Sequence, residues 1–248
     1  MKKFTIYIDG KYISCSQEVL DAFMPGTFKA RGVFETMRAI DGKIAFVPQH
    51  LERLQAGLKV LGIKRSDSSA KITAIIHRVI KKNTKLKDAR VRVMIFQQGK
   101  DVHCAVMAVP YTAPSVRQYK QGLRALMIKT NRSAVSHLAN VKSLDYSLFA
   151  DAYAQAKAQG YDEALLLNRK GHVFEASRGN IFILKGGVLM TPPLSSGCLN
   201  GIIRQQVMAM AKHLPIPILV RNCTPAMIKS ADKVFLTNSM VGIIPLVL

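Results

Sequence analysis

Apolar and polar residues alternate with a period of two along several short stretches of the chain, and this period predicts β-strands. Two Asp-Gly pairs, Asp9-Gly10 and Asp41-Gly42, are each flanked by such stretches. Asp-Gly is typical of the two-residue turns that join antiparallel strands, so each pair predicts a hairpin. The strands predicted in the first half of the chain are 4–8, 11–13, 34–40, 43–47, 90–96 and 102–109.

Other stretches repeat their apolar residues at the helical spacing of three and four. Leu51, Leu54, Leu58 and Leu61 lie on one face of such a helix, which Gly62 is expected to end. The other predicted helices are 68–82, 143–159, 201–214 and a short one that begins after Thr224 with Pro225. The strands predicted in the second half are 123–128, 188–191, 234–236 and three more inside 163–184.

A break in this pattern divides the chain into two parts. The stretch from Pro110 to Ser115 is polar and contains two prolines, as is typical of a linker between domains. The 248 residues are therefore expected to form an N-terminal α/β domain, residues 1–112, and a second domain, residues 117–248.

The charge of the chain points to anionic partners. There are 36 Lys and Arg residues against 15 Asp and Glu, a formal net charge of +21. Such a balance favours phosphates, carboxylate-rich metabolites or nucleic acid, unless it is a general property of the source proteome. The basic residues between Lys64 and Arg92 are not interleaved with aromatic residues that could stack on bases, which favours a solvated face over a nucleic-acid surface.

Several kinds of site and location are not indicated. The four cysteines are scattered without metal-site or disulfide-framework spacing, and the histidines are too dispersed for a metal cluster, so no metal is expected. The chain contains no P-loop, no Gly-x-Ser-x-Gly and no Gly-x-Gly-x-x-Gly after a strand. No uncharged apolar stretch approaches the length of a membrane span, so a soluble, cytoplasmic protein is expected.

One carboxylate stands out from its surroundings. Glu175 lies between Val173-Phe174 and Ala176 in a predicted strand. It either faces outward on a half-exposed strand or is buried against a cation. A lysine and such a carboxylate, together with a cationic or main-chain cradle for phosphate, could hold pyridoxal phosphate. Lys142, Arg53 and the helix that starts near Gly201 could supply the lysine and the cradle.

The order of short motifs along the chain resembles that of the class IV pyridoxal-phosphate aminotransferases. Each motif is weak by itself, whereas eight in order are specific, and the resemblance runs from about residue 3 to 247. The motifs are Val33 to Arg38, His50 to Leu54, Lys142 to Tyr146, Asp162 to Leu165, Val173 to Ser177 with Asn180 to Phe182, Thr191 to Pro193, Leu199 to Arg204, and Thr237 to Pro245.

The resemblance implies a fold and a cofactor. It implies the α/β (α+β) class and the fold of type IV pyridoxal-phosphate enzymes, with a small N-terminal α/β domain and a larger, barrel-like C-terminal domain that hold the cofactor between them in a homodimer. Lys142 is similar to the lysine that binds the cofactor covalently, and Glu175 to the partner of the pyridine nitrogen. Tyr146 would donate to the phenolic oxygen of the ring and Leu199 would pack on its face, although simple core packing is an alternative for both.

The resemblance also implies a phosphate site and a substrate site. Arg53, the main chain of Ile202 and Ile203, and Ser239 would hold the phosphate. Thr36 would assist proton transfer or position the substrate, and Arg38 would meet substrate carboxylates.

Three departures from the family pattern concern these sites. Ile203 stands where Thr is usual, which removes a hydroxyl contact to the phosphate, and Asp145 replaces a frequent Asn. The stretch from Pro25 to Arg31 lacks the usual Tyr-Gly-Asp before Gly32, which affects the substrate-side wall of the pocket.

Members of this family catalyse different reactions. Thr36, within Phe34-Glu35-Thr36-Met37-Arg38, and the tail Asn238-Ser239-x-x-Gly242-Ile243-x-Pro245 are similar to the aminodeoxychorismate lyases. These enzymes convert 4-amino-4-deoxychorismate to 4-aminobenzoate and pyruvate in folate biosynthesis. We therefore expect a lyase, with a branched-chain or D-amino-acid aminotransferase as the alternative. A non-enzymatic anion or nucleic-acid binder is the hypothesis from another class.

Overall fold

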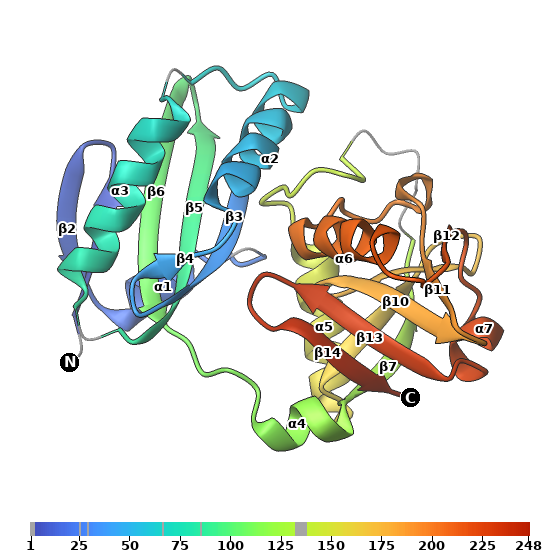
Figure 1. Ribbon diagram of the computed structural model, residues 1–248. Coiled ribbons are helices and arrows are strands. Elements are labelled where there is room, and N and C mark those ends of the chain that lie inside the picture. The colour runs from blue at the N-terminus through green and yellow to red at the C-terminus, as the bar shows by residue number, and fades with distance from the viewer. Residues whose placement is uncertain (1–2, 25, 29, 66, 85, 132–137) are drawn as a thin grey trace. The chain divides into compact units, whose positions relative to one another are not determined.

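The structure is a computed structural model that describes residues 3–24, 26–28, 30–65, 67–84, 86–131 and 138–248. The chain forms two compact units (Figure 1). Unit 1 consists of Met1–Thr112 and Val141–Ser147, and unit 2 of Ala113–Asn140 and Leu148–Leu248. The segment Val141–Ser147 therefore joins unit 1, although unit 2 surrounds it in sequence. The division into a small N-terminal domain, 1–112, and a larger C-terminal domain, 117–248, stays a prediction.

Unit 1 is built on an antiparallel six-stranded sheet with the order β2-β1-β6-β5-β3-β4. Both Asp-Gly hairpins are confirmed, because Asp9, Gly10, Asp41 and Gly42 adopt the positive φ angles that such turns require. The strands are β1 (Phe4–Ile8), β2 (Lys11–Cys15), β3 (Arg31–Ile40), β4 (Lys43–Ile44), β5 (Asp88–Gln98) and β6 (Asp101–Pro110). The helices are α1 (Gln17–Ala22), α2 (Val47–Val60) and α3 (Ser69–Lys82).

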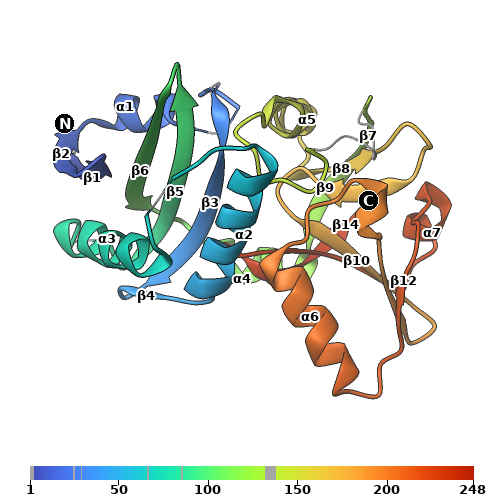
Figure 2. The same cartoon turned by 90° about the horizontal axis from the view of Figure 1, so that it is seen from above.

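The sheet of unit 1 has two differently covered faces. Helices α2 and α3 lie over one face and α1 lies over the other, as Figure 2 shows. Because neighbouring residues of a strand point to opposite faces, β3 turns Val33, Glu35 and Met37 toward α2. It turns Phe34 to the other face, where the Phe34 ring packs against Leu144 and Tyr146.

The segment Val141–Ser147 is held against β3 by main-chain hydrogen bonds. Phe34 N donates to Lys142 O at 3.0 Å, and Leu144 N donates to Gly32 O at 2.9 Å. The helix predicted at 143–159 therefore begins only at Ser147, because Ser143 forms a β-bridge with Val33 of β3. This correction matters for the site, since it takes Lys142 away from a helix start and places it beside a strand.

Unit 2 contains an eight-stranded sheet with the order β12-β11-β10-β13-β14-β7-β8-β9. The strands are β7 (Leu123–Lys129), β8 (Glu163–Leu167), β9 (Val173–Ala176), β10 (Asn180–Lys185), β11 (Val188–Thr191), β12 (Ile218–Val220), β13 (Lys233–Asn238) and β14 (Gly242–Val247). The helices are α4 (Val116–Gln121), α5 (Ser147–Ala158), η1 (Leu194–Ser196), α6 (Ile202–Lys212) and α7 (Pro225–Lys229). Elements α1, α4, η1, β12 and β14 are not among the sequence predictions.

Helix α6 packs on the sheet of unit 2 over β10 and β13. Phe182 and Phe235 are directly opposite in register, their rings stack at 5.4 Å, and they pack against Ile203 and Val207 of α6. Residues two apart along a strand share a face. Asn180 and Thr237, the next pair in this register on the same face, therefore also lie on the side covered by α6. No helix among the residues described is long and apolar enough to cross a membrane.

Candidate active site

Lys142 lies on an aromatic surface in unit 1. Its half-buried side chain places Nζ 4.4 Å from the centroid of the Phe34 ring and 5.6 Å from that of the Tyr146 ring. The two rings meet edge to face at 5.3 Å. Aromatic faces attract a cation, so the rings restrict where the ammonium group can lie. Lys142 and Tyr146, which the resemblance assigns to the cofactor, are thus brought together.

Thr36 and a buried arginine lie on the same face of this sheet. Thr36 follows Phe34 by two residues in β3, and its register partner in β5 is Arg92. Arg92 is 6% exposed and its Nε has no hydrogen-bond partner among the described residues. Burial, together with the nearby Arg90, lowers the Arg92 pKa to about 10. Arg92 forms part of the wall of a cavity of about 220 Å³, and none of the described carboxylates forms an ion pair with it.

Arg53 is held in place by a buried carboxylate that the sequence interpretation did not include. Its Nε and Nη2 donate to the two oxygens of Glu35, each at 2.7 Å, and His50 Nδ1 lies 2.7 Å from Glu35 Oε2. Glu35 is fully buried. Although burial opposes its ionisation, the charge and hydrogen bonds of Arg53 and the bond to His50 lower its pKa to about 2. The pair of hydrogen bonds to Glu35 therefore fixes the orientation of the Arg53 guanidinium.

Arg38 already has a carboxylate partner within unit 1. Its Nε and Nη2 donate to the two oxygens of Asp88 at 2.9 and 2.6 Å, and its guanidinium lies over the Tyr111 ring. The expected role of Arg38 toward substrate carboxylates stays a prediction.

Glu175 is buried in unit 2, at 5% exposure, so the alternative of an outward-facing residue on a half-exposed strand is wrong. Its Oε2 accepts a hydrogen bond from Leu199 N at 3.1 Å. The Leu199 carbonyl in turn accepts from Asn180 Nδ2 at 2.7 Å. The carboxylate and the loop before α6 are thereby fixed to each other, which brings together two residues that the resemblance assigns to the cofactor ring.

The N-terminus of α6 is open to an anion. Gly201 is its N-cap residue and none of the described side chains caps the helix, so amides of the first turn, which includes Ile202 and Ile203, can point at a ligand. A Cβ atom at Gly201 would lie only 2.0 Å from Asn180 Oδ1, so glycine is required there. The Ile203 side chain packs into the apolar cluster beneath α6 and not toward the helix end.

Ser239 lies in the turn between β13 and β14. Asn238 shapes this turn, because its Oδ1 accepts hydrogen bonds from Met240 N at 2.8 Å and Val241 N at 2.9 Å. Its Nδ2 donates to Arg178 O at 2.9 Å, which ties the turn to the loop between β9 and β10. Ser239 itself is half-buried.

Two of the departures from the family pattern are visible in unit 1. Asp145 is exposed, and its oxygen accepts from Ser147 Oγ at 3.4 Å just before α5. In the stretch before Gly32, the Phe28 ring meets Phe96 edge to face at 4.8 Å. Pro25 and Lys29 of this stretch lie outside the described residues.

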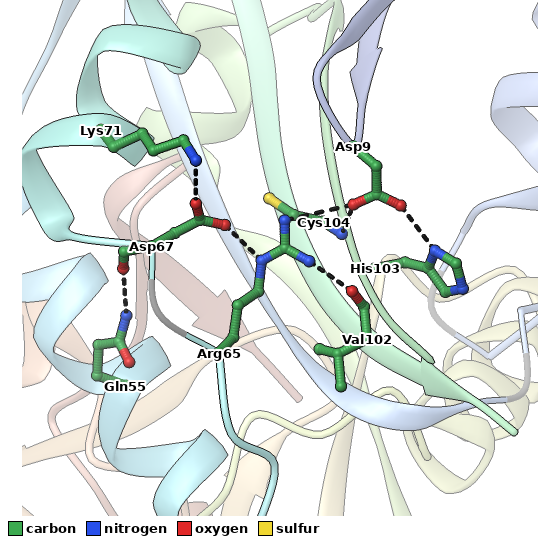
Figure 3. Close-up of polar contacts among 8 residues, drawn as sticks. All are labelled: Asp9, Gln55, Arg65, Asp67, Lys71, Val102, His103 and Cys104. Carbon is green, nitrogen blue, oxygen red and sulfur yellow. Dashed lines mark hydrogen bonds and ion pairs between the residues drawn. The ribbon is translucent and has the colours of Figure 1, made fainter. Parts of the chain in front are cut away.

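A second polar cluster in unit 1 is structural (Figure 3). The guanidinium of Arg65 bonds to Asp67, to the Val102 carbonyl and to Asp9, and Lys71 Nζ lies 2.6 Å from Asp67 Oδ1. Asp9 also accepts from Cys104 N at 2.8 Å and contacts His103 at 2.6 Å. These bonds join the loop before α3 to the β1–β2 turn and to β6. A surface groove of about 870 Å³ lies beside the cluster, lined in part by Lys59 and Lys64.

We predict that Asp67→Asn lowers the free energy of unfolding by about 1–3 kcal/mol. Asp67 is 9% exposed, and the change removes the shorter of the two carboxylate contacts of Arg65 and leaves only the one to Asp9 at 3.3 Å. Burial opposes ionisation of Asp67, but the bonds from Lys71 and Arg65 outweigh it and hold its pKa below the ordinary 3.8. The wild-type advantage should therefore be present above pH 3.8 and be lost as the pH falls through the lower folded-state pKa. Urea unfolding measures it, with Asp151→Asn on the exposed side of α5 as control.

Four further polar residues at these sites were missed by the sequence interpretation as functional groups. They are Glu35, Arg92, Arg204 and Thr237. Glu35 and Arg92 had a signal, because Glu35 shares a strand face with Val33 and Met37, and Arg92 lies between Val91 and Val93. Thr237 had none, since threonine is common in strands and its lack of a partner depends on what packs around it.

The residues present fit pyridoxal phosphate. Arg204 of α6 is 4% exposed and no described carboxylate pairs with it, while the Thr237 hydroxyl is buried without a partner among the described residues. An uncompensated cation and an orphaned hydroxyl near an uncapped helix N-terminus suit a bound phosphate. The buried Glu175 suits a cationic ring nitrogen, and Lys142 suits a covalent bond to an aldehyde. When bound, the cofactor supplies an electron sink for carbanion chemistry.

Comparison with known proteins agrees with this fit. The family model for amino-transferase class IV matches residues 32–248. A Methanocaldococcus jannaschii protein provisionally named branched-chain-amino-acid aminotransferase is 31% identical, over 97% of this chain and 86% of its own length. Aminodeoxychorismate lyase of Bacillus subtilis is 28% identical, over 97% of this chain and 85% of its own.

Solved structures give the same result for the fold. The branched-chain aminotransferase of Thermoproteus uzoniensis, solved with norvaline, superposes with a TM-score of 0.86 at 28% identity, over 99% of this chain and 86% of that one. Together with the family match, this shows that the protein belongs to the class IV aminotransferases, which are pyridoxal-phosphate enzymes of fold type IV.

Proposed function

We propose that this enzyme is an aminodeoxychorismate lyase, which releases 4-aminobenzoate and pyruvate from 4-amino-4-deoxychorismate in folate biosynthesis. The observation that carries the proposal is the pairing of Thr36 with Arg92 on the face of β3 that also bears Phe34 and Lys142. A hydroxyl on this face can assist proton transfer, and a buried guanidinium without a carboxylate partner among the described residues suits an anionic substrate.

The proposal gives each residue a role. Lys142 would hold the cofactor covalently, and as a free amine it would take the proton from the substrate carbon that bears the amino group. The enolpyruvyl group of the substrate leaves as the six-membered ring of the substrate becomes aromatic. Lys142 returns a proton to this leaving group, which yields pyruvate. Thr36 assists this proton transfer or positions the substrate. Arg92 binds one of the two substrate carboxylates, a role that supplements the one expected of Arg38.

The remaining site residues act on the cofactor. Glu175 stabilises the protonated ring nitrogen, Tyr146 donates to the phenolic oxygen, and Leu199 packs on the ring. Arg53, the main chain of Ile202 and Ile203, and Ser239 hold the phosphate. The homodimer and the cytoplasmic location stay predictions.

The decisive experiment mixes the purified protein with 4-amino-4-deoxychorismate under anaerobic conditions and follows 4-aminobenzoate by its fluorescence. We expect rapid release, which Thr36→Val slows about 100-fold because one proton-transfer aid is lost. Thr73→Val, a threonine on the exposed side of α3, is the matched control.

A branched-chain aminotransferase is the second candidate, because the relatives from Methanocaldococcus jannaschii and Thermoproteus uzoniensis carry that name. L-Leucine is therefore assayed in parallel, with 2-oxoglutarate as amino acceptor. D-Alanine is assayed in the same way to test for a D-amino-acid aminotransferase. Amino transfer to 2-oxoglutarate without release of 4-aminobenzoate would refute the lyase and leave the cofactor and the fold as they are.

A further inference from the structure

Thr237 buries a hydroxyl group for which the described part of unit 2 provides no partner. The side chain is 1% exposed, and Oγ1 forms no hydrogen bond with any of the described residues. Leaving a buried hydroxyl unsatisfied destabilises a protein, and a nonpolar residue of the same shape would avoid that cost. The other buried threonine of unit 2, Thr191, does have a partner, because its Oγ1 donates to Ile181 O at 2.9 Å. The hydroxyl of Thr237 therefore indicates a ligand.

The register of the sheet places this hydroxyl on the side of the α6 N-terminus. Thr237 pairs with Asn180, and directly opposite residues of two strands point to the same face. On that face Asn180 bonds to Leu199 O and closely approaches Gly201, the N-cap residue of α6. Phe235, two residues before Thr237 in β13, packs against the same apolar cluster as Ile203 of the first turn of α6. Thr237 is thus directed to the first turn of the helix.

The charges around this turn require an anion. Arg204 is the third residue of α6, where the helix dipole favours negative and not positive groups. Its guanidinium is 4% exposed, and among the described residues it donates only to the side chain of Asn200 and the carbonyl of Pro192. Burial lowers its pKa. A buried cation at the positive end of an uncapped helix is strongly unfavourable unless an anion binds there.

We propose that Thr237 Oγ1 donates a hydrogen bond to the cofactor phosphate bound at the N-terminus of α6. The inference rests on the phosphate position given under the proposed function, but not on which reaction the enzyme catalyses. The hydroxyl takes the place of the one that the family usually carries at position 203, where Ile203 packs its side chain beneath the helix. Arg204 supports the site through its charge, while Thr237 contacts the ligand.

Affinity for the cofactor tests this contact. Thr237→Val keeps the shape and the strand preference of threonine and removes only the hydroxyl. For the protein freed of cofactor, we expect the Kd of pyridoxal 5′-phosphate to rise about tenfold, the effect of one charge-assisted hydrogen bond. The affinity for inorganic phosphate, measured as a competitor of the cofactor, should fall by a similar factor. Pyridoxal, which lacks the phosphate, should bind with unchanged affinity, and Thr237→Ser should retain wild-type affinity.

Thermal unfolding separates this contact from a packing effect. Without cofactor, Thr237→Val should be at least as stable as the wild type, because valine buries no unsatisfied hydroxyl. With cofactor bound, it should gain less stability than the wild type. Thr191→Val is the matched control: it breaks a bond inside the protein, so it should lower Tm with and without cofactor and leave the preference for the phosphorylated ligand unchanged.

Equal affinity of Thr237→Val and wild type for pyridoxal 5′-phosphate and for inorganic phosphate would overturn the proposal. The Thr237 hydroxyl would then be part of the protein interior and would not contact the phosphate. These binding measurements involve no turnover, so they test the contact in the same way whether the enzyme is a lyase or an aminotransferase.

Discussion

The Lys142→Ala protein is expected to lose the visible absorbance of the bound cofactor and about 10⁴-fold in activity. Covalent attachment and proton transfer are both assigned to the Lys142 amine, so the variant lacks the group that performs both. The fold should be retained, because the main-chain bond between Phe34 N and Lys142 O does not depend on the side chain. Absorbance spectra and turnover of 4-amino-4-deoxychorismate measure both effects.

Two further variants are controls for the Lys142→Ala result. Lys142→Arg keeps a cation for the Phe34 and Tyr146 rings but has no primary amine, so it should also be colourless and inactive. Lys120→Ala, on the exposed side of α4, should remain yellow and active. A Lys142→Ala protein that stays yellow and active would show that another lysine binds the cofactor.

Replacing Glu35 by Gln is expected to lower the free energy of unfolding by about 3 kcal/mol. The change leaves the guanidinium of Arg53 without its counter-ion in a site where the glutamate is fully buried. For a chain of this size, such a loss lowers Tm by roughly 10 °C. Thermal and urea unfolding measure it, with the same change at the exposed Glu52 of α2 as control.

The effect of Glu35→Gln should depend on pH in a defined direction. The folded-state pKa of Glu35 is lowered from 4.5 to about 2, so the wild type gains its stabilisation above pH 4.5 and loses it as the pH falls toward 2. A pKa lowered by that much corresponds to about 3 kcal/mol, in agreement with the expected loss. The difference between wild type and variant should therefore shrink across this window. A difference that stays constant from about pH 6 to pH 2 would contradict the ion pair as its cause.

Local patterns in the sequence predicted most of the helices and strands. The two Asp-Gly pairs marked hairpins, since few residue pairs tolerate the positive φ angles found at Asp9-Gly10 and Asp41-Gly42. The leucine repeat of α2 and the Thr224-Pro225 start of α7 were also recognisable, and Thr224 Oγ1 indeed accepts from Met227 N at 3.2 Å. The order of the motifs identified the family. Turn geometry, helix capping and helix spacing involve residues a few positions apart, so they can be inferred from the sequence.

Only the tertiary structure decided which polar groups are buried and what they meet. It placed Lys142 beside β3, brought Arg53 into hydrogen bonds with Glu35, and left the hydroxyl of Thr237 buried beneath α6. Each depends on segments that are far apart in sequence, and burial determines whether an unpaired charge or hydroxyl costs free energy. The sequence by itself therefore determined most of the elements, the family and the cofactor. The pairing of distant strands and helices decided which polar residues lie together and which are buried.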